Sequence, residues 1–156
     1  SSRALAMHVR AFPGPDRELD DVRQVLFRLG DWRRPGVRVL RMGGQHGPLV
    51  EKALYRLITL GIVTDYTVLW REQAHLVRLA GPDDAEIARR LRAGILGLGA
   101  PDVGEAPGPA PEGALKALLG AVYATIERRR RASLGRMLEN CLSASSPVAL
   151  HGRGLR

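Results

Sequence analysis

The 156-residue sequence predicts an α+β, mostly helical fold: a three-helix core with a β-hairpin, followed by a helical C-terminal extension. Leu and Val recur at helical spacing of three and four residues over most of the chain. One β-branched and aromatic stretch divides into two strands around a polar turn. Aromatic residues make up only 4% of the chain, so the core is expected to consist of Leu, Val, Ile and Ala.

The first helix is expected to run from Asp16, as its N-cap, to Leu29, with Gly30 at the position of a C-terminal stop. Residues 37–40 alternate as a short strand does, and Pro48 suits the first turn of a second helix, which Gly61 ends.

The β-hairpin is expected next, from 62–69 and 74–79, around the turn 70–73. Further elements are expected from helical spacing and from composition. They are a helix over 83–98, a Pro/Gly linker over 99–113, a long helix over 114–142 and a disordered tail over 143–156. The region 15–82 then forms the predicted binding domain.

A helix, a Leu-Gly-Ile-Val junction and a β-hairpin follow one another in the order of a winged helix. Residues 20–82 resemble the winged-helix part of the RecQ C-terminal domain, an accessory domain of RecQ-type DNA helicases. The matching stretches are 21–26, 37–43 and, above all, Leu-Ile-Thr-Leu-Gly-Ile-Val-Thr at 57–64. The helix over 114–142 resembles a C-terminal extension of some bacterial RecQ-like helicases.

The sequence departs from that family in two ways. The four-cysteine zinc module that usually precedes the winged helix is not in this sequence, and neither is the Gly-x-x-x-x-Gly-Lys-Ser/Thr loop of an ATPase motor. Because the sequence begins at Ser1 without a Met, we expect it to be a piece of a longer protein. The resemblance implies that the ATPase motor lies elsewhere in a parent ATP-dependent DNA helicase, which serves DNA repair or recombination in the bacterial cytoplasm, near the nucleoid.

The charge of the chain favours an anionic partner. Lys and Arg number 24 and Asp and Glu 16, for a formal net charge of +8, and nucleic acid is the first candidate. The single cysteine excludes a disulfide framework and a Cys-based zinc site, and it fits a reducing compartment. No apolar run is long enough to span a membrane. Double-stranded or forked DNA is therefore the expected partner, and no association with a membrane is expected.

The helix before the hairpin carries basic and polar side chains that fit a major groove, where Arg reads guanine edges and Lys meets phosphate. A solvated outer face is the alternative. With the preceding loop, the expected DNA-binding residues are Arg41, Gln45, Lys52, Tyr55, Arg56 and Thr59.

The hairpin carries a second set of candidates. The resemblance implies that it sits where the strands of a duplex part, with an aromatic or apolar tip stacked on the last base pair. Trp70 and Arg71 lie at the turn, and Tyr66 lies on the strand before it. The alternative is that Trp70 folds back over the sheet.

Other basic residues are expected mainly to be solvated. Arg38 and Arg41 differ by three positions and should point to opposite faces of an extended strand. Four successive arginines, 128–131, sweep around a helix and cannot form one stripe. We expect Glu127 to pair with Arg131, and Arg130 to lie along the apolar row.

No catalytic motif, metal site or cofactor site is expected in this chain, because its histidines are scattered and its paired acids lie at helix starts. Two other functions remain open. One is a winged-helix transcription regulator that dimerises through the 114–142 helix, and the other is a winged helix that binds protein.

Overall fold

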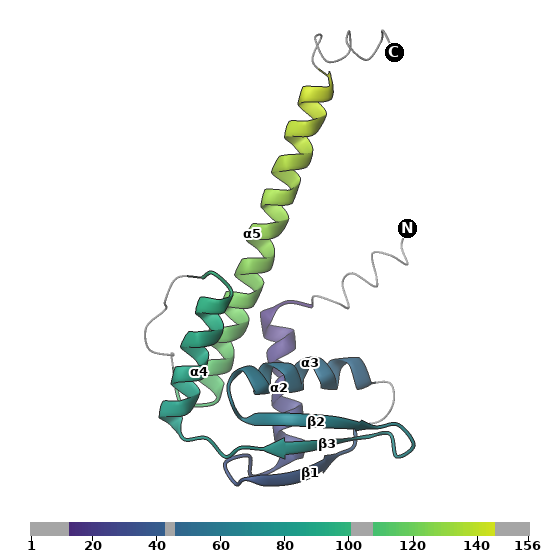
Figure 1. Cartoon of the computed structure of the whole chain (residues 1–156), viewed down its shortest axis with the longest axis vertical. Helices are drawn as coiled ribbons and strands as arrows, with labels where there is room; N and C mark the ends of the chain where they lie inside the picture. The colour runs from purple at the N-terminus through teal and green to yellow at the C-terminus, as the bar shows by residue number, and fades with distance from the viewer. Residues whose placement is uncertain (1–12, 43–45, 101–107, 146–156) are drawn as a thin grey trace. The chain divides into compact units, whose positions relative to one another are not determined.

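The computed structural model describes residues 13–42, 46–100 and 108–145. In chain order its elements are α2 (Pro15–Leu29), β1 (Gly36–Leu40), α3 (Gly47–Thr59), β2 (Val63–Leu69), β3 (Ala74–Leu79), α4 (Asp84–Gly97) and α5 (Glu112–Ser145) (Figure 1). The fold is α+β and mostly helical, as predicted. The chain divides into two compact units, Ser1–Tyr123 and Ala124–Arg156, and the boundary falls within α5.

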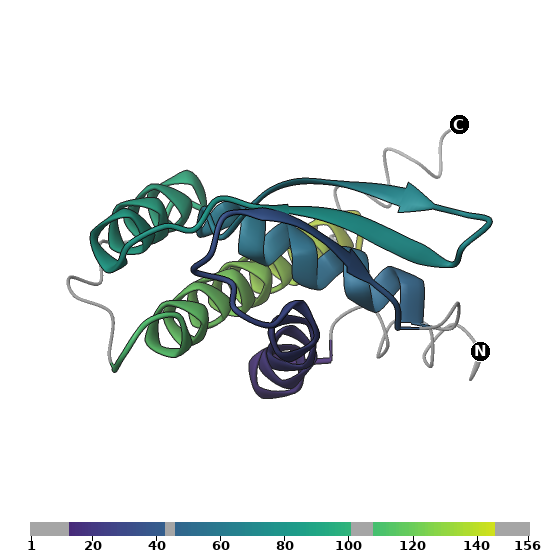
Figure 2. The same cartoon turned by 90° about the horizontal axis from the view of Figure 1, so that it is seen from below.

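The three strands form one antiparallel sheet in the order β1-β3-β2. The sheet is a single layer, and α2 and α3 lie on one of its faces (Figure 2). β2 and β3 form the predicted hairpin, with Leu69 opposite Ala74. In the turn, the N–H of Gln73 donates to the carbonyl of Trp70 at 3.4 Å, and Gln73 adopts a φ of 50°. The hairpin therefore places Trp70 and its neighbours at the end of the sheet.

A Schellman motif joins α3 to the hairpin. Gly61, at a φ of 76°, donates its N–H to the carbonyl of Ile58, and the N–H of Ile62 donates to the carbonyl of Leu57, both at 3.0 Å. The positive φ requires a residue without a Cβ, so Gly61 ends the helix as predicted. Ile62 and Val63 are then buried where the chain enters the hairpin.

The core of the first unit is aliphatic, as predicted, and is made of side chains from every described element. Its largest buried members are Leu40, Leu54, Leu57, Leu60, Ile62, Leu79, Ile87, Leu91, Ile95, Leu115, Leu118 and Leu119. Burying one such side chain contributes about 1.5–3 kcal/mol.

Both helices that were expected within 15–82 are present, and further helical packing comes from α4 and the first turns of α5. One expectation for the start of α2 is wrong. Asp16 does not cap α2, because Gly14 is the N-cap and Pro15 is the first helical residue. A proline at that position supplies the helical φ itself, so Asp16 falls within the first turn. The expected start of α4 is confirmed, since Asp83 accepts a 2.8 Å hydrogen bond from the N–H of Glu86.

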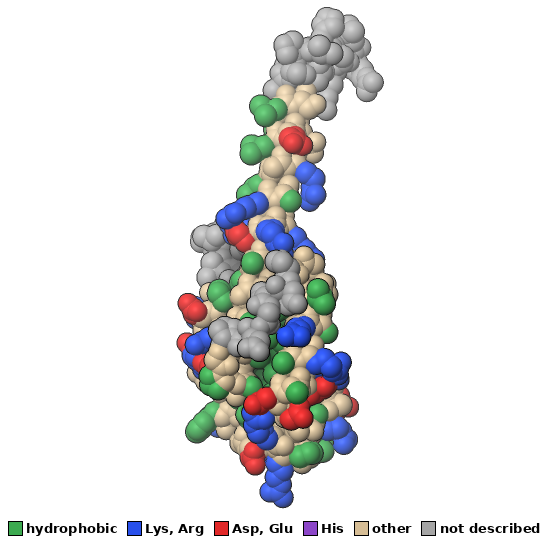
Figure 3. Space-filling model, turned by 90° about the vertical axis from the view of Figure 1, so that its left-hand side faces the viewer, with side chains coloured by type: hydrophobic (Ala, Val, Ile, Leu, Met, Phe, Trp, Pro, Cys, Tyr) green, Lys and Arg blue, Asp and Glu red, His purple; other side chains and the backbone are tan. Residues whose placement is uncertain are grey.

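The long C-terminal helix is confirmed but has different bounds, Glu112–Ser145 rather than 114–142. Residues 143–145, expected in the tail, therefore belong to it; the rest of the tail and residues 101–107 of the linker lie outside the described residues. The apolar stripe is buried at its start, at Leu115, Leu118, Leu119 and Val122. In the second unit, whose described residues are this helix alone, Leu134, Met137, Leu138 and Leu142 are exposed, and green side chains appear along that segment in Figure 3.

Candidate nucleic-acid interface

The face of α3 that was expected to read DNA is largely engaged within the protein. The Nε of Arg56 donates to Oε1 of Glu18 on α2 at 2.9 Å, and the two side chains are only 14% and 2% exposed. An arginine that is buried against a buried carboxylate has little guanidinium surface left for a base or a phosphate. The structure thus gives Arg56 a partner inside the fold.

Thr59 also faces another element. Its hydroxyl donates to the carbonyl of Tyr55 at 3.1 Å, and its methyl lies 2.9 Å from the position that a Cβ on Gly94 of α4 would take. Lys52 is half-buried. Burial raises the pKa of the Asp21 carboxyl, and the positive charge of Lys52 partly opposes that increase. Among the expected residues of this helix, Tyr55 alone is largely exposed, at 62%.

The hairpin turn presents the other expected residues to solvent. Trp70 is 81% exposed, and Arg71 beside it is exposed. Nη1 of Arg41 donates to the carbonyl of Glu72 at 3.3 Å, which brings the segment after β1 to the same turn. Its exposure excludes Trp70 as a core residue. Gln45 lies outside the described residues.

Tyr66 lies on β2, half-buried, beside a pocket between the hairpin and the start of α3. Its ring is 5.9 Å from that of His75 on β3, centroid to centroid, with an angle of 54° between the two planes. Burial raises the pKa of Tyr66, and the charge and hydrogen bonding of Glu51 on α3 raise it further. Tyr66, His75 and Glu51 therefore form one group that links the hairpin to α3.

The remaining basic residues are mostly exposed, as expected, and several of them also have partners within the protein. Arg33 stacks on Trp32, with its Cζ 4.4 Å from the ring centroid, and it donates to Asp84 at 2.6 Å. Arg38 donates to the carbonyls of residues 34 and 37. On the body, Lys and Arg are interspersed with Asp and Glu on the face shown in Figure 3. The positive charge does not gather into one patch there.

The arginine run of the second unit behaves largely as predicted. Nε of Arg131 donates to Oε1 of Glu127 at 3.2 Å, which confirms that pair, and Arg130 lies 3.9 Å from the other oxygen of the same carboxylate. The side chain of Arg130 is 65% exposed, so it turns to Glu127 rather than along the apolar row.

No group of three or more His, Cys, Asp or Glu side chains that could hold a metal occurs in the described part of the chain. None of the helices in that part is long and apolar enough to cross a membrane. No family model, curated protein or solved structure matches this chain.

Glu18 and Glu51 were not predicted from the sequence to have a role. Glu18 stands at helical spacing with Val22, Val25 and Leu29, so it occupies a place in the apolar row of α2 and its burial could have been predicted. Arg56 likewise falls between the buried Ala53 of α3 and Leu60, which caps the end of α3. Glu51 left no comparable signal, because a single acid on a helix is usually solvated.

Proposed function

We propose that this chain is a winged-helix DNA-binding domain that grips duplex DNA near a fork and assists strand separation through its hairpin. The order of the elements supports the proposal, since α3 runs directly into the β2–β3 hairpin and β1 pairs with β3 as the third strand. The formal net charge of +8 favours a polyanionic partner.

The exposed indole at the hairpin turn is the observation that carries this proposal. Trp70 is 81% exposed in a chain that has only two tryptophans. Stacking a base on an aromatic ring contributes about 1–3 kcal/mol. That is close to the roughly 0.6–2.2 kcal/mol of stacking per DNA base-pair step. One indole can therefore compensate for the separation of about one base pair.

Arginines at the same turn supply contacts to the backbone. Arg71 is exposed, and Arg41 is anchored on the carbonyl of Glu72. Since Arg56 and Thr59 are engaged within the fold, α3 offers few groups that could read base edges. This favours recognition of DNA structure over recognition of sequence.

The resemblance to RecQ-type helicases extends the proposal to the parent protein. In that arrangement, an ATPase motor elsewhere in the parent chain pulls one strand while this domain holds the duplex. The parent would act in bacterial DNA repair or recombination.

Binding of forked and blunt duplexes at several salt concentrations tests the proposal. We expect tighter binding of the fork, and a loss of roughly tenfold on Trp70→Ala, since about 1.4 kcal/mol of stacking corresponds to tenfold. A Trp32→Phe background leaves Trp70 as the only indole, and its fluorescence should be quenched by the fork. Negligible affinity at low salt would refute the DNA role.

A second function, a transcription regulator that dimerises through α5, is favoured by one observation. The apolar side chains of Leu134, Met137, Leu138 and Leu142 are exposed at helical spacing, as a helix-pairing stripe would be. That function requires a dimer in solution and a preference for one palindromic sequence. A monomer with equal affinity for unrelated sequences excludes it.

A further inference from the structure

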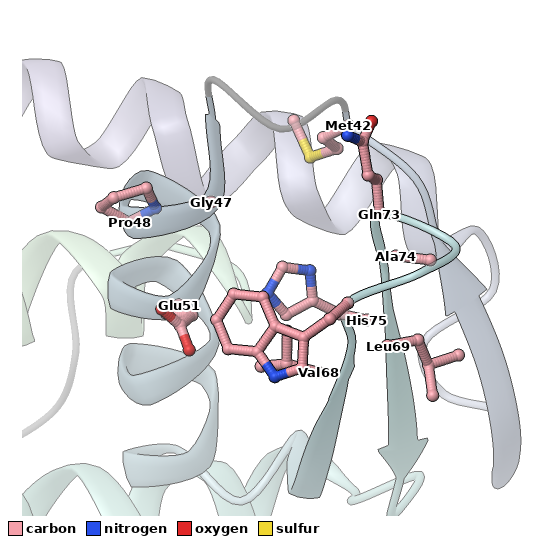
Figure 4. A pocket seen from close by; sticks show the side chains of 10 residues that line it. Met42, Gly47, Pro48, Glu51, Val68, Leu69, Gln73, Ala74 and His75 are labelled. Atoms are coloured by element: carbon pink, nitrogen blue, oxygen red, sulfur yellow. The ribbon is translucent and has the colours of Figure 1, made fainter.

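A pocket of about 330 Å³ opens between the start of α3 and the β2–β3 hairpin (Figure 4). Its walls come from both elements and from the end of the segment after β1: Met42, Gly47, Pro48, Glu51, Val68, Leu69, Trp70, Gln73, Ala74 and His75. In the close view, Glu51 reaches from α3 and His75 from β3 toward the same space. The indole of Trp70 thus belongs both to the exposed turn and to the wall of this pocket.

The lining of the pocket indicates the chemistry of its ligand. An indole, a thioether and aliphatic carbons provide surfaces for a flat apolar body, and Glu51 provides hydrogen-bond acceptors. None of these lining residues is Lys or Arg, and one of them is an acid. A phosphate group would therefore be repelled, whereas a planar ring with N–H donors would be satisfied.

The size of the pocket points to a small ligand. Pockets for small molecules span about 300–1,000 Å³, and this one lies at the lower end. A single nucleobase fits that range better than a peptide or a folded partner does. Enzymes and binding proteins that read an unstacked base hold it between aromatic or apolar side chains and hydrogen-bond its pairing edge.

Glu51 is on the α3 wall of the pocket, near Tyr66 and His75 of the hairpin. The Tyr66 ring lies 5.9 Å from the imidazole of His75, which is buried. A carboxylate in the pocket wall favours a base with an exocyclic amine, because the amine donates directly to it. Thymine is disfavoured, since its only pairing-edge donor lies between two carbonyl oxygens that repel the carboxylate.

We propose that this pocket receives the first unpaired base of the strand that leaves the duplex at the hairpin, and that Glu51 selects an amine-bearing base over thymine. The inference rests on the proposed function, because Trp70 must first stand at the fork. It adds a base preference that stacking alone does not provide, since every base can stack.

The experiment compares forked duplexes that differ only in the first unpaired nucleotide, bound by the whole chain. We expect cytosine or adenine at that position to bind about fivefold to tenfold more tightly than thymine. Glu51→Gln should abolish this preference, because an amide can donate to thymine as well as accept from an amine.

The matched control is Glu72→Gln. It removes the same charge from the exposed hairpin turn, so it raises affinity for all forks alike but should keep the preference between bases. A probe on the DNA side needs no protein variant: a 2-pyrimidinone in place of cytosine lacks only the exocyclic amine and should bind as weakly as thymine does. Thermal unfolding of each variant reports its folding.

The outcomes separate this inference from the proposed function. If fork binding depends on Trp70 but not on the identity of the first unpaired base, the base pocket is refuted and the proposed function stands. The same holds if Glu51→Gln and Glu72→Gln behave alike. If forks do not bind, or bind equally well without Trp70, both proposals fall together.

Discussion

Arg56 of α3 donates from Nε to Oε1 of Glu18 of α2 across 2.9 Å, where the glutamate side chain is 2% exposed. The second oxygen of Glu18 is buried close to the buried hydroxyl of Tyr123, and neither atom meets hydrogen-bond geometry. Burial, followed by the charge of Glu18, raises the pKa of Tyr123. This polar cluster ties α2, α3 and α5 together within the first unit.

Replacing one partner of the Arg56–Glu18 pair should destabilise the fold strongly. Arg56→Ala leaves a buried carboxylate without its cation, which costs roughly 3–5 kcal/mol. The double variant Glu18→Leu with Arg56→Met removes both charges and should recover most of that loss. Urea unfolding measures both. If Arg56→Ala lowered DNA affinity without lowering stability, Arg56 would be a DNA contact after all.

Removing Arg71 or Arg41 should change the salt dependence of DNA binding. When an arginine no longer neutralises a phosphate, the slope of log affinity against log salt becomes shallower by about 0.9. Arg92→Ala on α4 is the matched control, because α4 lies at the opposite end of the sheet from the hairpin turn (Figures 1 and 2) and Arg92 is exposed too. Equal slopes for all three variants would show that Arg71 and Arg41 do not bind phosphate.

Gly81, which follows the hairpin, should not tolerate a side chain. It adopts a φ of 65°, and an added Cβ would lie 2.6 Å from the carbonyl oxygen of Arg33 and 2.7 Å from the ring of Pro35. Gly81→Ala should therefore lower the free energy of unfolding by more than about 1 kcal/mol. Gly120 lies on α5, and a Cβ added there would meet no atom within 4 Å. Gly120→Ala should therefore raise the free energy of unfolding by up to about 1 kcal/mol. Thermal unfolding of the two alanine variants distinguishes the effects.

The acid stability of α4 should depend on Glu86. Hydrogen bonds from Arg89 and Arg90 lower the pKa of this carboxyl from 4.5 to about 2. Because the pKa is lower in the folded state, the stabilisation is fully present above pH 4.5 and is lost as the pH falls toward 2. A carbon-detected NMR titration of Glu86 measures the pKa, and Arg89→Gln should move it upward. An ordinary value in the wild-type chain would contradict the two hydrogen bonds.

Periodicity was enough to predict where the elements lie. The spacing of Leu, Val and Ile, with Gly61 and the polar turn 70–73, predicted α3 and both strands of the hairpin nearly to the residue. The signal is local, because it depends on which side chains share one face of a helix or strand. The start of α2 was not predicted correctly, since Pro15, and not a residue after Asp16, is the first helical residue.

The fate of the charged residues could not be predicted in the same way. Arg56 and Arg71 are both arginines near the hairpin, yet one lies against Glu18 and the other in solvent. The apolar stripe of α5 shows the same limit, because Leu119 and Leu134 look alike in sequence and differ in burial. Whether a side chain is covered depends on which other element lies opposite it.

The sequence by itself determined the helices, the hairpin, the aliphatic core and the excess of positive charge, since these follow from residue type and spacing along one chain. The tertiary structure alone decided that Glu18 neutralises Arg56, that Trp70 remains exposed and that Glu51 meets Tyr66 and His75 beside one pocket. The contacts of Glu18 and Glu51 join residues far apart in the chain. The free energies of such contacts, like the exposure of Trp70, depend on distances and burial that only the folded chain creates.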